Sequence, residues 1–192
     1  MKRKILLLLV ILSSLFICTA CTSKPTQDNI IFNFDFVEYI GLPYEESLIK
    51  MELTENDLIA RDEHGLYAYV DSITYNDYAF TKYLTFGTYN GHDNALYGGG
   101  YEYFFDETNE TCITLIKELK EQLVKQYGEP TTYPGLSNTI DNLKNVSDCT
   151  DGASFGDTWA IDGNTSGTIA LTITLGPSFT EVQMEYRVAA TK

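Results

Sequence analysis

The sequence has few of the residues that most catalytic and nucleic-acid-binding sites require. It contains two histidines, four cysteines, one tryptophan, and 13 basic residues against 27 acidic ones, for a formal charge of −14. A field of this sign repels phosphate groups, which argues against a nucleic-acid partner. The run Gly98-Gly99-Gly100 lacks the Gly-Lys-Ser/Thr that completes a phosphate-binding loop. No catalytic residue, cofactor-binding residue or metal ligand is predicted.

The first 20 residues have the pattern of an export signal. The basic start Lys2-Arg3-Lys4 precedes an apolar run at positions 5–17. This run is shorter than the about 20 apolar residues that span a bilayer. The small pair Thr19-Ala20 before Cys21 resembles the cleavage motif of bacterial lipoproteins, although Cys18 stands where that family usually has Leu. Residues 1–20 are therefore predicted to be a lipoprotein signal peptide and Cys21 the lipidation site, with ordinary cleavage or an uncleaved anchor as alternatives.

The rest of the chain is expected to form one acidic domain behind a short tether. Three of the 13 basic residues and none of the 27 acidic residues lie in the leader, so the mature chain has a formal charge of −17. Residues 21–29 are polar and contain Pro25, which is typical of a tether. Residues 30–192 are enough for one packed domain. The negative charge suits cationic partners, divalent ions or solubility alone.

Two cysteines remain after the leader and the lipidation site are set aside. Cys112 and Cys149 would fold outside the reducing cytosol, where a disulfide persists. Such a bond would stabilise the fold by roughly 3–4 kcal/mol in the chain-entropy model. We predict the Cys112–Cys149 disulfide, and two separate buried thiols are the alternative.

The hydrophobic periodicity predicts helices and strands in a mixed order. Helices are expected at 44–51 and 110–127, and strands at 66–75, 79–89, 101–105, 155–161, 168–175 and 181–188. The dipeptide Asn90-Gly91 is favoured in two-residue hairpin turns. The long polar connection at 131–154 is unusual in a compact domain. The order predicts an α+β fold of two layers, with helices packed on one face of a mostly antiparallel sheet.

Short motifs of this domain resemble the beta-lactamase-inhibitor-like group, which includes small envelope assembly lipoproteins built from helix-then-strands repeats. The resemblance lies in Gly41-Leu42-Pro43-Tyr44-Glu45-Glu46, in Tyr127-Gly128-Glu129-Pro130, and in Trp159 with the last two strands. It would cover about residues 36–188 and implies a non-enzymatic binding or assembly module.

Tyrosine is the most suggestive functional feature, because nine of the 14 tyrosines lie between positions 67 and 103. A tyrosine ring offers an apolar face and one hydroxyl, which suits protein interfaces and sugars. Tyr101 and Tyr103 share one face of a strand, and Glu102 and Phe104 share the other. We expect Tyr101 and Tyr103 to contact a ligand if they are exposed, whereas packing within the sheet is the alternative.

Together these patterns predict an acidic lipoprotein that is anchored on the extracytoplasmic side of the cell membrane through Cys21. The expected role is a non-enzymatic binding or assembly module with a cationic protein, a peptide or a glycan as partner. The alternative is a small cell-envelope hydrolase that uses carboxylates as acid and base, for which two carboxylates about 5–9 Å apart in a deep pocket would be required.

Overall fold

The computed structural model describes residues 32–61, 67–132, 135–136, 138–146, 152–161, 167–176 and 179–188. These residues belong to one compact unit, residues 31–192. The predicted leader and tether, with the lipidation site Cys21, lie outside the described residues, as does Cys149.

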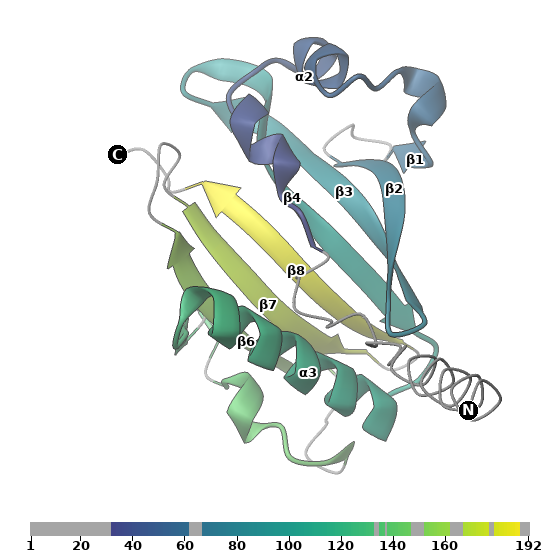
Figure 1. Ribbon diagram of the computed structural model, residues 1–192, viewed down its shortest axis with the longest axis vertical. Helices are drawn as coiled ribbons and strands as arrows, with labels where there is room; N and C mark the ends of the chain where they lie inside the picture. Colours follow the sequence, from purple (N-terminus) through teal and green to yellow (C-terminus); the bar gives the residue numbers. More distant parts are fainter. Residues whose placement is uncertain are drawn as a thin grey trace, which may run out of the picture. The chain divides into compact units, whose positions relative to one another are not determined.

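The described chain alternates helices with antiparallel strands (Figure 1). Its helical elements are the 3-10 turns η1 (Asp35–Tyr39), η2 (Glu55–Asp57) and η3 (Ile140–Asn142), and the α-helices α2 (Tyr44–Lys50) and α3 (Glu110–Tyr127). Its strands are β1 (Ala60–Arg61), β2 (Tyr67–Tyr75), β3 (Tyr78–Tyr89), β4 (His92–Phe105), β5 (Thr131–Thr132), β6 (Ser154–Ile161), β7 (Gly167–Leu175) and β8 (Thr180–Val188).

The strands form one eight-stranded sheet in the order β1-β2-β3-β4-β8-β7-β6-β5. Every neighbouring pair is antiparallel. Each half of the chain has the same order of an α-helix, a two-residue edge strand and a three-stranded meander, and the last strands of the two halves, β4 and β8, pair at the centre. The prediction of an α+β chain dominated by an antiparallel sheet is therefore confirmed.

The best predicted helix has the predicted bounds, because local signals mark both of its ends. The Oδ1 atom of Asn109 accepts hydrogen bonds from the backbone N–H groups of Thr111 (2.9 Å) and Cys112 (3.3 Å), which caps the first turn of α3. Gly128 follows the last turn with φ of 83°, a conformation that suits glycine. The buried side of α3 carries Cys112, Ile113, Leu115, Ile116, Leu119 and Leu123.

One strand was predicted too short. β4 begins at His92 rather than at Tyr101, and Gly98, Gly99 and Gly100 lie in its body, where the register with β3 shifts between Leu96 and Gly98. Glycine is a weak strand former, so local propensity underestimates this segment. The preceding hairpin was predicted correctly, since Asn90 and Gly91 both have positive φ between β3 and β4.

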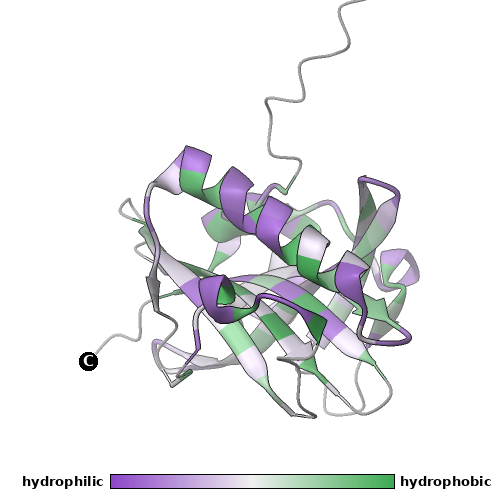
Figure 2. Cartoon of the chain, turned by 90° about the horizontal axis from the view of Figure 1, so that it is seen from below, coloured by the Kyte–Doolittle hydropathy of each residue, from purple (hydrophilic) through white to green (hydrophobic). Residues whose placement is uncertain are grey.

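Helix α3 lies on one face of the sheet (Figures 1 and 2). The indole Nε1 of Trp159 in β6 donates to the Gly128 carbonyl oxygen at 2.8 Å. The Lys120 ammonium of α3 pairs with the buried Asp157 carboxylate of β6 at 2.9 Å and with Asp141 at 2.7 Å. These contacts join α3 and the long 131–154 connection to the sheet. Among the described helices, none is long and apolar enough to cross a membrane.

Candidate functional site

The register of the sheet assigns each strand residue to one of two faces. Asp157 and Trp159 point toward α3, and Asp157 pairs across the sheet with Leu171. Leu171 pairs with Met184, which in turn pairs with Tyr101. We call this side the α3 face. The side chains of Glu102, Phe104, Glu181 and Glu185, which alternate with these residues, lie on the opposite side.

Tyr101 is a core residue of the α3 face, which corrects the expectation that it contacts a ligand. Its side chain is 2% exposed, and its hydroxyl donates to the Asn33 carbonyl oxygen at 2.6 Å. Its ring contacts Phe32 and Phe34, with centroids 5.1 and 5.9 Å away. Burial raises its pKa to about 12. The segment that precedes η1 packs on this ring, and Tyr101 therefore has no surface to offer a partner.

Tyr103 has the same orientation but is only half-buried. Its ring packs against Tyr78 and Phe105, with centroids 5.2 and 4.8 Å away. The two tyrosines share a face as predicted, with Glu102 and Phe104 on the other. Tyr101 is therefore excluded from the predicted binding surface by its burial, whereas contact of the half-buried Tyr103 with a ligand stays a prediction.

The opposite face brings together residues that are distant in the sequence. Glu102 lies across from Gln183, Phe104 across from Glu181, and Gly100 across from Glu185. We call the surface formed by Glu102, Glu181 and Glu185 and their neighbours the glutamate face. Its neighbours on the same side are Tyr67, Tyr69, Thr81, Tyr83, Thr85, Phe104, Gln183 and Arg187. This face has the aromatic and acidic character that was expected of the tyrosine face.

The three glutamates are held in an unfavourable environment for negative charge. Burial, and then the neighbouring Glu181, raise the pKa of Glu102 from 4.5 to about 7. Burial and then Glu185 raise the pKa of Glu181. Burial also raises the pKa of Glu185, although Arg187 opposes this rise. A positive charge placed on this face would stabilise all three carboxylates.

Two buried hydroxyls of the glutamate face have no hydrogen-bond partner among the residues that the structure describes. They are Tyr83 Oη and Thr85 Oγ1, in side chains that are 0% and 1% exposed. The Tyr83 hydroxyl lies over Gly100, 3.0 Å from where a Cβ atom would stand, and the Glu185 Cα atom is 2.9 Å from the same point. Glycine at this position leaves the space that the tyrosine ring fills. An unpaired buried hydroxyl costs free energy, so each is a ready acceptor or donor for an incoming polar group.

An exposed aromatic pair borders the glutamate face. Phe104 and Phe179 are 51% and 40% exposed, and their ring centroids are 6.1 Å apart. Phe104 lies directly across from Glu181. Apolar and acidic groups therefore adjoin on one surface, as in a site for a segment that carries both apolar and basic side chains.

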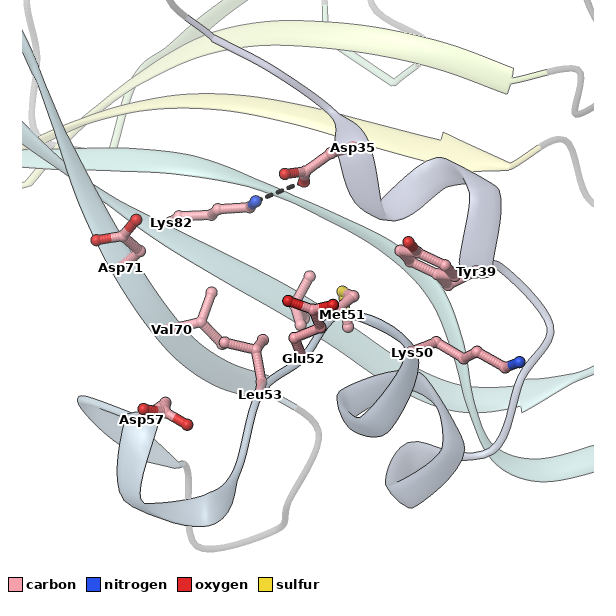
Figure 3. A pocket seen from close by; sticks show the side chains of 11 residues that line it. Asp35, Tyr39, Lys50, Met51, Glu52, Leu53, Asp57, Val70, Asp71 and Lys82 are labelled. Atoms are coloured by element: carbon pink, nitrogen blue, oxygen red, sulfur yellow. Dashed lines mark hydrogen bonds and ion pairs between the residues drawn. The ribbon is translucent and has the colours of Figure 1, made fainter.

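A separate pocket of about 570 Å³ lies between η1, α2 and the β2–β3 hairpin (Figure 3). The Lys82 ammonium reaches toward the Asp35 carboxylate at 2.5 Å, and Asp71 is its cross-strand neighbour. Because Asp35 already neutralises Lys82, that amine is poorly suited to act as a nucleophile or to bind an anion. The residues that line this pocket do not include the three glutamates.

The described residues contain no group of three or more His, Cys, Asp or Glu side chains arranged to hold a metal ion. Ser154 lies in a Gly-x-Ser-x-Gly sequence, 152–156, which has the spacing of a serine-hydrolase nucleophile turn. That turn joins a strand to a helix, whereas Ser154 begins β6 and its Oγ lies 3.3 Å from Thr174 Oγ1 of β7. The Gly-x-Ser-x-Gly spacing is therefore present, but the strand-turn-helix geometry of a serine-hydrolase nucleophile is not.

Cys112 is buried at the start of α3, and its thiol donates to the Glu107 carbonyl oxygen at 3.4 Å. Burial raises the pKa of this thiol. No disulfide joins it to another cysteine among the residues that the structure describes. Because Cys149 lies outside them, the Cys112–Cys149 bond stays a prediction. Intact-mass analysis after alkylation without reduction would contradict it by finding both thiols modified.

Comparisons of the chain with family models, curated proteins and solved structures found no match. The resemblance to the beta-lactamase-inhibitor-like group therefore stays a hypothesis. The three glutamates were not predicted to be site residues, although two features of the sequence mark them. Glu181 and Glu185 occupy the polar positions of an alternating strand, and Glu102 interrupts an aromatic one.

Proposed function

We propose that this protein is a lipid-anchored, extracytoplasmic binding module whose glutamate face takes a basic polypeptide partner. The observation that carries the proposal is the gathering of Glu102, Glu181 and Glu185 on one face of the sheet beside exposed phenylalanines. Burial raises the pKa of each of these carboxylates, and Glu185 alone among the three has a basic partner, Arg187, in the described part of the chain, so the face lacks compensating positive charge. A partner with basic side chains supplies that charge, and the net charge of −14 steers it toward this protein.

The proposed architecture is two layers, with both α-helices on the α3 face. The Tyr44 ring of α2 packs against Phe86 of β3, with centroids 4.8 Å apart. The Arg61 guanidinium lies 4.1 Å from the centre of the same Tyr44 ring. Arg61 pairs across the sheet with Ala68, and Ala68 pairs with Leu84, so the three side chains lie on one face. Leu84 and Phe86 alternate with Thr85 of the glutamate face. The glutamate face is then the layer surface left for a partner, as in a helix-then-strands module.

The carboxylate-hydrolase alternative depends on Glu102. A glutamate with a pKa near 7 beside a second carboxylate is the arrangement that a general acid requires. However, Glu102 and Glu181 line neither the Lys82 pocket nor the pocket of about 650 Å³ between η1 and the end of α3. A sheet surface suits binding better than the water-restricted chemistry of hydrolysis, and the binding function is therefore preferred.

The test of the binding function compares two double substitutions that change the net charge equally. Glu102→Gln with Glu181→Gln alters the glutamate face, whereas Glu121→Gln with Glu129→Gln alters one exposed glutamate within α3 and one that follows it. Full-length protein in detergent micelles is titrated at pH 8 with amidated hexa-lysine and hexa-arginine. We expect the first variant to lose affinity roughly tenfold and the control less than about twofold, because local charge outweighs net charge. Equal losses would contradict the proposal.

The lipid anchor has its own test. Replacing Cys21 by Ala should release the protein from membranes or leave an unprocessed precursor, because the predicted lipid is attached to the Cys21 thiol. Radiolabelled fatty acid on Cys21→Ala at the wild-type level would contradict the anchor and would leave the binding function to be judged by the peptide titration alone.

A further inference from the structure

We infer that the glutamate face contains a slot for one guanidinium group at Glu185, that Arg187 of the same chain covers this slot, and that the partner anchors itself there through an arginine. The inference rests on the proposed function and deepens it, because it names the group by which the basic partner is recognised.

The chain itself places a guanidinium on the Glu185 carboxylate. Arg187 Nε donates to Glu185 Oε2 at 2.8 Å. The two side chains differ sharply in exposure, because Arg187 is 52% exposed and Glu185 is 4% exposed. Arg187 leaves only if another cation takes its place, because Glu185 would otherwise be a buried carboxylate without a counterion. A second guanidinium supplies that charge, so the exchange replaces one ion pair of Glu185 by another.

The atoms around Glu185 suit a guanidinium better than an ammonium. A guanidinium has five N–H donors in one plane, whereas an ammonium is a compact group with three donors. Beside the Glu185 carboxylate, the unpartnered hydroxyl oxygens of Tyr83 and Thr85 are acceptors on the same face. Gly98 and Gly100 lie between these hydroxyls and β8 and have no side chains. The space over both glycines is filled, because Thr85 Oγ1 and Tyr83 Oη lie 2.9 and 3.0 Å from where the Cβ atoms of Gly98 and Gly100 would stand. An incoming guanidinium therefore takes the place beside Glu185 that Arg187 occupies.

Aromatic rings border the same place. The Tyr67 and Tyr69 ring centroids lie 6.0 and 6.3 Å from the Tyr83 centroid. Both outer rings are half-buried, so part of each is open to solvent. Arginine stacks on aromatic faces more readily than lysine does, which adds to its preference for this place.

The charge balance of the face leaves room for a further cation. Among the described strands, Arg187 is the basic residue on this face, against Glu102, Glu181 and Glu185. The other basic strand residues, Arg61 and Lys82, belong to the α3 face. A partner arginine that displaces Arg187 from Glu185 leaves Arg187 free to approach the remaining carboxylates. The exchange therefore raises the positive charge on the face without leaving Glu185 unpaired.

The test compares two peptides of equal charge, amidated hexa-arginine and hexa-lysine, on full-length protein at pH 8. We expect hexa-arginine to bind roughly tenfold more tightly than hexa-lysine, because only a guanidinium uses the planar slot. Arg187→Gln should strengthen hexa-arginine binding by removing the competitor. Glu185→Gln should reduce the arginine preference to less than about twofold, since it removes the charged acceptor.

Tyr83→Phe keeps the inference testable if Glu185→Gln folds poorly. It removes only an unpartnered hydroxyl, so the fold is expected to persist, and circular dichroism checks this for every variant. Tyr83→Phe should lower the arginine preference while leaving hexa-lysine binding within about twofold of the wild type. The proposed slot would be contradicted if the preference for hexa-arginine over hexa-lysine persisted in both Glu185→Gln and Tyr83→Phe. It would also be contradicted if Arg187→Gln bound hexa-arginine more weakly than the wild type.

The outcomes separate the two proposals. Equal affinity for the two peptides, with both weakened by Glu102→Gln and Glu181→Gln, would overturn the slot and leave the basic-partner function in place. Failure of the wild-type protein to bind either peptide would overturn both.

Discussion

Replacing Glu102 by Gln should stabilise the fold at pH 8 and have little effect at pH 5. Burial and Glu181 raise the pKa of Glu102 from 4.5 to about 7 in the folded chain. Below pH 4.5 the carboxyl is protonated in both the folded and unfolded states. Between pH 4.5 and 7 the folded chain binds more protons, so the free energy of unfolding falls as the pH rises, and above pH 7 the full cost of the buried charge is present.

The magnitude follows from that rise in pKa. At about 1.4 kcal/mol per pKa unit, the rise from 4.5 to about 7 corresponds to at most about 3–4 kcal/mol. Because Glu102 is partly exposed, solvent screening reduces this figure to about 1–2 kcal/mol. Glutamine has nearly the same shape and no charge, so Glu102→Gln removes the cost. We therefore expect it to gain about 1–2 kcal/mol at pH 8 and less than about 0.5 kcal/mol at pH 5.

Urea unfolding of the full-length chain at the two pH values measures this difference. Glu129→Gln is the matched control, because it removes the same charge from an exposed residue that follows α3. It corrects for the relief of general repulsion in a chain with a net charge of −14. If Glu102→Gln and Glu129→Gln change the free energy of unfolding equally at pH 8, burial and Glu181 do not destabilise the ionised Glu102 carboxylate, and the reasoning is refuted.

Two further substitutions test the packing of the α3 face. Lys120→Met should destabilise the fold by roughly 3 kcal/mol, because it leaves the 2%-exposed Asp157 carboxylate without its ammonium partner, whereas Lys125→Met on the exposed side of α3 should cost less than about 0.5 kcal/mol. Equal effects of the two in thermal unfolding would show that the buried pair is absent. Tyr101→Phe should cost about 1 kcal/mol through loss of one hydrogen bond. Tyr101→Ala should cost roughly 3–5 kcal/mol, and a binding defect in Tyr101→Ala without loss of stability would restore the surface role that its burial excludes.

Local sequence signals were enough to find most of the secondary structure. Spacings of three and four residues, the cap at Asn109 and Gly128 at the end determine the bounds of α3, since each depends on neighbours within one or two turns. Alternation with period two placed β2, β3, β6, β7 and β8 within about two residues of their observed bounds. The opposite faces of Tyr101 and Glu102 follow from the same alternation.

The tertiary structure decided which face of the sheet is covered and which side chains come together on the opposite face. Tyr101 is buried because residues 32–34 fold back over it, although nearly 70 residues separate them in the sequence. Burial raises the pKa of Glu102 most, and Glu181 raises it further because the pairing of β4 with β8 brings the two residues onto one surface. Side-chain alternation depends only on adjacent residues, whereas a cross-strand neighbour depends on which strands pair and in which register. The sequence by itself therefore determined the strands and their two faces, and the pairing of β4 with β8 decided that glutamates rather than tyrosines form the candidate binding surface.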